Sequence, residues 1–85
     1  CMAEAGRKAG LPADLAMRLA RETVAGAGEL LHRSSEEAAT LRQNVTSPGG
    51  TTAAALSVLM ADNGMQPLFD QAIAAARKRA QELGS

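Results

Sequence analysis

Bulky apolar side chains are scarce in this 85-residue sequence. Phe69 is its one aromatic residue, and valine and isoleucine together occur only four times, whereas alanine occurs 19 times and leucine 10 times. Alanine and leucine favour helices, and the shortage of β-branched and aromatic residues argues against a sheet. Alanine supplies little core volume, so the helices must approach closely to exclude water. The composition therefore predicts one small all-α domain whose core is completed by a second chain.

Cysteine and histidine are almost absent. The single cysteine, Cys1, excludes an internal disulfide, and the single histidine, His32, excludes a histidine pair. We therefore expect no metal site, because zinc sites need several such ligands. A lone cysteine is also consistent with a reducing compartment, so we expect a cytoplasmic protein.

An excess of charge of either sign is also missing. Nine basic and nine acidic residues give a formal net charge of zero, which argues against nucleic-acid binding. The longest uncharged run, Gln43 to Ala61, is long enough to raise the question of a membrane span. Its first half is polar and rich in helix breakers, and such a backbone could not satisfy its hydrogen bonds in lipid. We therefore expect no membrane association.

Helical periodicity and helix end signals divide the sequence into about five helices. Gly10 has the position of a residue just beyond a helix end, and Ser34 with Glu37 forms a capping-box pattern. The first helix has no cap before it, so we expect it to be truncated and the chain to be a piece of a longer protein. The expected helices are Met2–Ala9, Leu11–Arg33, Ser35–Asn44, Thr51–Ala61 and Gln66–Leu83.

The second expected helix has an unusually wide apolar face. Two adjacent stripes run along it, one starting at Leu15 and the other at Ala16, and both reach the last turn. Four small residues follow one another between Ala25 and Gly28. Glycine within a helix costs about 1 kcal/mol relative to alanine, a cost that close helix packing can offset. This pattern predicts a central helix in close contact with another helix.

The segment Ser47-Pro48-Gly49-Gly50-Thr51-Thr52 is the one stretch that points to chemistry. It is a loop entering a helix N-terminus, where unpaired amides and the helix dipole favour a small anion such as a carboxylate or phosphate. A capped helix start without a ligand is the alternative interpretation. A phosphate-binding P-loop is excluded, because no lysine follows the last glycine and no strand precedes the loop.

The string from Leu41 to Thr52, LRQNVTSPGGTT, resembles the signature of pyrroline-5-carboxylate reductase. Gly10-Leu11-Pro12, the helix through Thr23 to Gly28 and the closing amphipathic helix support the resemblance, which covers nearly all of the chain. The resemblance implies reduction of 1-pyrroline-5-carboxylate to L-proline with NADPH or NADH, the last step of proline biosynthesis. It implies that residues 1–85 are the C-terminal dimerisation and substrate-binding domain, and that an N-terminal Rossmann domain for the cofactor is missing.

The resemblance also assigns roles to individual residues. The hydroxyl of Ser47 and the amides of Gly50 and Thr51 would bind the substrate carboxylate, and the catalytic hydroxyl of Thr52 would hydrogen-bond the ring nitrogen. Asn44 would lie near the nicotinamide of the cofactor. The chain would intertwine with a second copy as a homodimer able to assemble further, and the isolated fragment would be inactive. The alternative is a helical oligomerisation module with no ligand role.

Overall fold

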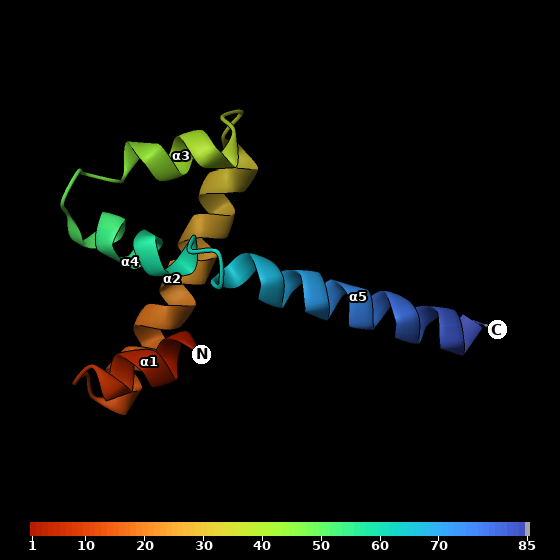
Figure 1. Cartoon of the computed structure of the whole chain (residues 1–85). Coiled ribbons are helices and arrows are strands. Elements are labelled where there is room, and N and C mark those ends of the chain that lie inside the picture. The colour runs from red at the N-terminus through yellow and green to blue at the C-terminus, as the bar shows by residue number, and fades with distance from the viewer. Residues whose placement is uncertain (85) are drawn as a thin grey trace. The chain divides into compact units, whose positions relative to one another are not determined.

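The computed structural model describes residues 1–84 and is built of helices (Figure 1). The described residues contain no strand, which confirms the all-α prediction. They divide into two compact units, one from Cys1 to Thr40 and the other from Leu41 onward. The five helices in chain order are α1 (Met2–Lys8), α2 (Ala13–Arg33), α3 (Ala38–Asn44), α4 (Thr51–Leu59) and α5 (Met65–Gly84).

In the first unit, α1 and α2 pack against each other at a sharp turn. Gly10, at φ +113°, follows the end of α1, and the amides of Gly10 and Leu11 donate to the carbonyls of Arg7 (3.0 Å) and Gly6 (3.1 Å). This is the Schellman arrangement, which satisfies the last carbonyls of a helix and favours glycine at the positive φ. The prediction that Gly10 stops the first helix is confirmed.

Ala16 lies at the centre of this turn. It is the one buried apolar residue of the described chain, at 3% exposure. A Cβ atom added to Gly6 would lie 3.3 Å from the Cβ of Ala16 and 3.4 Å from Cδ1 of Leu11, so α1 and α2 meet with almost no spare volume. The turn is thus stabilised by packing within the chain itself.

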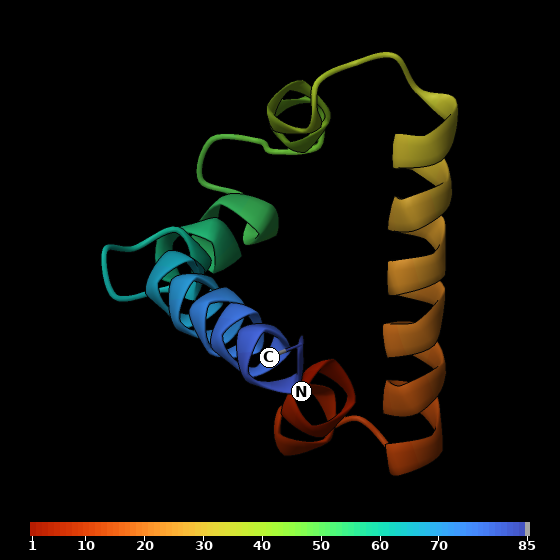
Figure 2. The same ribbon diagram turned by 90° about the vertical axis from the view of Figure 1, so that its right-hand side faces the viewer.

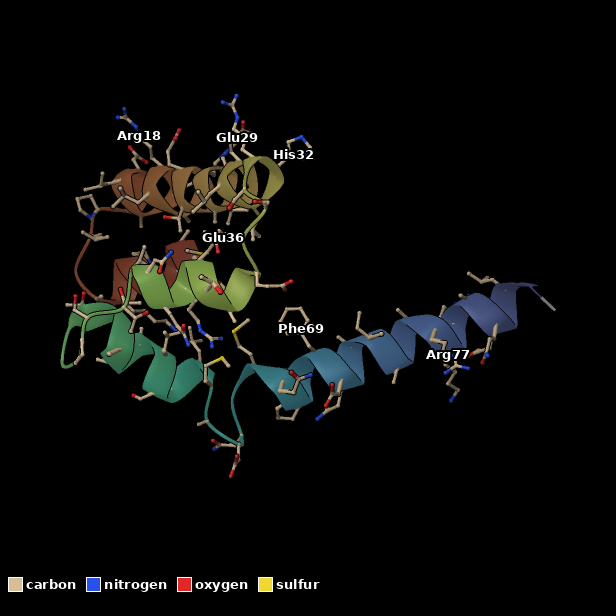
Figure 3. All side chains as sticks on the ribbon, turned by 90° about the horizontal axis from the view of Figure 1, so that it is seen from above. Arg18, Glu29, His32, Glu36, Phe69 and Arg77 are labelled. Carbon is tan, nitrogen blue, oxygen red and sulfur yellow. The ribbon has the colours of Figure 1, made fainter. Side chains whose placement is uncertain are left out.

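Beyond this turn, α2 continues as one straight helix (Figure 2). Arg18, Glu29 and His32 project from one side of it (Figure 3), and Glu29 forms an ion pair with Arg33. The large apolar side chains of α2 are 41–63% exposed, and they include Leu15, Leu19, Val24, Leu30 and Leu31.

The start of α3 differs from the sequence-based expectation. The helix begins at Ala38, three residues later than the predicted Ser35. The hydroxyl of Ser34 accepts a hydrogen bond from the amide of Glu36 at 3.0 Å, two residues on. Since that bond forms a local turn, Ser34 does not cap α3 and the predicted capping box is wrong.

In the second unit, a tight turn joins α4 to α5. The amide of Gly64 donates to the carbonyl of Ala61 at 2.8 Å. A Cβ atom on Gly64 would lie only 2.3 Å from the carbonyl oxygen of Leu59, so this turn requires glycine. Every residue of α5 except Pro67 is exposed. None of the helices within residues 1–84 combines the length and the apolarity needed to cross a membrane.

Candidate substrate-binding loop

The loop between α3 and α4 begins where Thr46 closes the end of α3. The Thr46 hydroxyl donates to the carbonyl oxygen of Arg42 at 2.6 Å, and its amide donates to the carbonyl oxygen of Gln43 at 3.1 Å. These bonds satisfy carbonyls that the end of the helix would otherwise leave unpaired. The point at which the chain leaves α3 is therefore fixed by Thr46.

A β-turn follows, formed by Ser47, Pro48, Gly49 and Gly50. The amide of Gly50 donates to the carbonyl oxygen of Ser47 at 2.9 Å, and Gly49 has φ +74°. Proline at the second turn position and a positive φ at the third are the signature of a type II turn, which needs glycine or asparagine at the third position. The sequence Ser-Pro-Gly-Gly thus specifies the backbone of the loop.

The turn leads directly into the N-terminus of α4. Gly50 is the N-cap residue, its carbonyl accepts the first helical hydrogen bond from Ala54 (3.1 Å), and no side chain caps the helix. The amides of the first turn, beginning with Thr51 and Thr52, therefore point out of the helix end as donors. A Cβ atom on Gly50 would lie 3.1 Å from the Ser47 carbonyl oxygen. Glycine at this position therefore avoids a tight contact across the turn.

The structure brings the predicted substrate-binding residues together at one helix start. Ser47 and Thr51 are exposed, whereas Gly50 and Thr52 are half-buried. Gly50 differs from the expectation in one respect, because its amide already donates to Ser47. To bind a carboxylate as well, that amide would share its hydrogen between two acceptors. Asn44 is the last residue of α3 and is exposed.

The electrostatics of the loop come from its backbone. No charged residue occurs between Arg42 and Asp62, so any attraction for an anion would come from the amides and the dipole of α4. Within residues 1–84, no three histidine, cysteine, aspartate or glutamate side chains lie close enough together to hold a metal ion. Chemically, the loop offers hydroxyl and amide donors.

Two residues that support the loop do not stand out from the sequence. Thr46 lies within the string from Leu41 to Thr52 and fixes the end of α3. Arg42 also contacts α4 near its far end, where its Nη1 lies 3.8 Å from the Sδ of Met60. The sequence signal for Thr46 was its place four residues after Arg42, the spacing of a helical hydrogen bond. The contact of Arg42 with Met60 spans 18 residues and has no local signal.

The other notable feature of the chain is the amount of apolar surface that it leaves uncovered. Apart from Ala16, no described residue forms a buried apolar core. Large apolar side chains of α5 are 55–70% exposed, among them Leu68, Phe69, Ile73 and Leu83. Exposed apolar surface of this extent is typical of a protein–protein interface.

Comparison with known proteins shows the family of the chain. Residues 1–83 match the family model described as pyrroline-5-carboxylate reductase dimerisation. A pyrroline-5-carboxylate reductase of Synechocystis is 43% identical over 83 residues, which are 98% of this chain and 31% of the relative. The reductase of Pseudomonas aeruginosa is 45% identical over 82 residues (96% and 30%), and that of Thermus thermophilus is 42% identical over 83 residues (98% and 31%). The chain thus spans less than a third of the length of these relatives.

Proposed function

Since the chain belongs to the pyrroline-5-carboxylate reductase dimerisation family, we propose that it is the dimerisation and substrate-binding part of an NAD(P)H-dependent enzyme that reduces 1-pyrroline-5-carboxylate to L-proline. The observation that carries the proposal is the loop from Ser47 to Thr52, a hydrogen-bonded turn that leads directly into the uncapped N-terminus of α4. A small carboxylate fits such a helix start because the unpaired amides and the helix dipole both favour negative charge.

The substrate carboxylate would accept hydrogen bonds from the Ser47 hydroxyl and the Thr51 amide. Gly50 would contribute by closing the turn and by leaving room for the carboxylate next to the backbone, and its amide would share its hydrogen with the ligand. The Thr52 hydroxyl lies one residue further into α4 and is half-buried. We assign it the hydrogen bond to the ring nitrogen, the atom that receives the proton.

Catalysis by this chain would consist mainly of positioning. A carboxylate fixed at the helix start aims the imine carbon in one direction, and such orientation lowers a barrier by several kcal/mol. The nicotinamide supplies the hydride. We expect it to be bound chiefly by an N-terminal Rossmann domain of the full-length enzyme, with Asn44 near the nicotinamide. The 85-residue chain alone is then expected to be inactive.

The same proposal includes a homodimer. The chain has one buried apolar residue, and its largest apolar side chains are mostly half-exposed or more. A chain of 85 residues cannot gain enough stability from such limited burial. A second copy would cover these faces, and the resemblance implies that the two copies intertwine.

A helical oligomerisation module without a ligand role remains the second candidate, because the uncovered apolar surface supports both. Steady-state kinetics of the full-length enzyme containing this chain separate the two. We expect reduction of 1-pyrroline-5-carboxylate with NADPH or NADH as the hydride donor, and a rise in KM of about tenfold or more when Ser47 is replaced by alanine. Unchanged kinetics in the Ser47→Ala enzyme would favour the module without a ligand role.

A further inference from the structure

Apolar residues on the exposed face of α5 recur with a spacing of seven residues. Phe69, Ala76 and Leu83 form one row along the helix, and Ile73 and Ala80, preceded by the polar Gln66, form a second row beside it. Written as a heptad, the first row occupies the d positions and the second row the a positions. Apolar residues at both positions are typical of a helix that pairs with another helix. Phe69 and Ile73 are 55% and 65% exposed.

Two opposite charges flank this apolar seam. Asp70 and Arg77 both occupy the e position, seven residues apart. At about 1.5 Å of rise per residue, this spacing separates them by about 10 Å along the axis, so they do not pair within one helix. Asp70 accepts a hydrogen bond from Gln66 at 2.8 Å, and Arg77 takes part in no ion pair within residues 1–84.

We propose that α5 packs antiparallel against α5 of a second copy, with Asp70 of each chain paired to Arg77 of the other. In an antiparallel pair related by a twofold axis, e positions face e positions of the partner helix, and a residues form layers with d residues. The arrangement that pairs Asp70 with Arg77 also sets Phe69 against Ala80 and Ile73 against Ala76. In these two central layers a large side chain meets a small one, and in the outer layer Leu83 meets Gln66.

The same charges disfavour the neighbouring registers. A shift of the partner by one heptad in one direction brings Asp70 opposite Asp70, and a shift in the other direction brings Arg77 opposite Arg77. Like charges facing each other at an interface oppose association and exclude wrong partners. The sequence of α5 is therefore self-complementary in one antiparallel register, which identifies the occupant of this face as a second copy of the chain.

This inference rests on the proposed homodimer and adds the contact and register to it. The test uses two charge-reversed chains, Asp70→Arg and Arg77→Asp, refolded together from equal amounts and separated by ion-exchange chromatography. Homodimers of either variant contain only like-charge contacts, whereas the heterodimer restores both ion pairs. We expect heterodimers to form about nine-tenths of all dimers, above the statistical half.

A matched control replaces Arg77→Asp with Lys78→Asp, which changes the charge equally but lies at the outward f position. Mixed with Asp70→Arg, it should give a heterodimer share close to the statistical half. The double variant Asp70→Arg/Arg77→Asp should dimerise like the parent. Equal heterodimer shares in the two mixtures would overturn the α5 pairing while leaving the homodimer intact, whereas a monomeric parent in sedimentation equilibrium would overturn the homodimer itself.

Discussion

The α1–α2 junction and the α3–α4 junction both contain glycine and proline, but the first buries a side chain and the second leaves polar groups exposed. Each contains a glycine at positive φ, Gly10 at +113° and Gly49 at +74°, and each contains a proline close to that glycine. At the first junction the turn brings Ala16 against α1 and buries it. At the second junction the turn exposes the Ser47 hydroxyl and an uncapped helix start.

The difference between the two junctions follows from the side chains next to the glycine. Leucine and alanine surround Gly10 and supply apolar contacts, so that turn is completed by packing within the chain. Serine and threonine surround the turn at Gly49 and supply hydrogen-bond donors. Hydrogen-bond donors that stay exposed contribute little to the stability of the fold. Their presence on a defined turn therefore favours a role in binding.

The largest expected effect concerns the hydroxyls of the second junction. In the full-length enzyme containing this chain, Thr52→Ala should lower kcat and Ser47→Ala should mainly raise KM, each by about ten- to a hundredfold. A hydrogen bond to a charged group is worth about 1.5–3 kcal/mol, and a contact made only in the transition state affects kcat. Steady-state kinetics measure both values.

Ser57→Ala is the matched control for these two variants. Its hydroxyl also lies in α4 but donates to the carbonyl of Ala54 at 2.6 Å, away from the helix start. We expect parental kinetics for this variant. Loss of activity in Ser57→Ala equal to that in Thr52→Ala would mean that α4 is merely sensitive to substitution.

A substitution at the first junction should lower the free energy of unfolding. Ala16→Leu should destabilise the folded chain by about 1–3 kcal/mol, because the added atoms have no space beside Gly6. Ala74→Leu, at an exposed position of α5, adds the same atoms without a contact within the chain. Chemical denaturation followed by circular dichroism measures the difference, and an unchanged midpoint for Ala16→Leu would contradict the packing at this junction.

A loss of stability of similar size is expected for a substitution further along α2, where the proposed packing involves the second copy. Apart from the neighbouring residues and the backbone of α2 itself, no atom lies within 4 Å of a Cβ placed on Gly26, so in a lone chain Gly26→Leu should be tolerated. In the proposed dimer, overpacking of a close helix contact should cost about 1–3 kcal/mol, whereas Lys78→Ala should stay within about 0.5 kcal/mol. Equal melting temperatures for Gly26→Leu and the parent would place this stretch of α2 outside the interface.

The smallest expected effects on stability concern the two glycines at positive φ. Gly10→Ala and Gly49→Ala should each destabilise the chain by about 1 kcal/mol, since a side chain at positive φ is strained. Only Gly49→Ala should also raise KM in the full-length enzyme, because its turn carries the proposed binding site. Equal KM values for the two variants would remove the functional distinction between the junctions.

Local signals predicted most of the fold. The ends of α2 and α4 and the stop at Gly10 lie within two residues of the sequence-based expectation, because periodicity, proline and glycine act over short distances. The start of α3 was wrong, since the Ser34 hydroxyl can bond to either of two nearby amides and only the structure identifies Glu36 as its partner. The contact between Arg42 and Met60 could not be predicted from helix periodicity, because it joins residues 18 positions apart.

The site was predictable in part for the same reason. The loop and its hydroxyls followed from Ser-Pro-Gly-Gly-Thr-Thr, whereas the hydrogen bond from Gly50 to Ser47 depends on the turn type that the chain adopts. The roles of Ser47, Gly50, Thr51, Thr52 and Asn44 toward substrate and cofactor stay predictions.

A titration of the isotope-labelled chain with L-proline, followed by NMR, tests the contrast between the two junctions most directly. The amides of Thr51 and Thr52 should shift with saturation, those of Gly10 and Leu11 should not, and Ser47→Ala should weaken the response. Absence of saturable shifts at the second junction, or equal shifts at both, would contradict the assignment of the loop as a carboxylate-binding site.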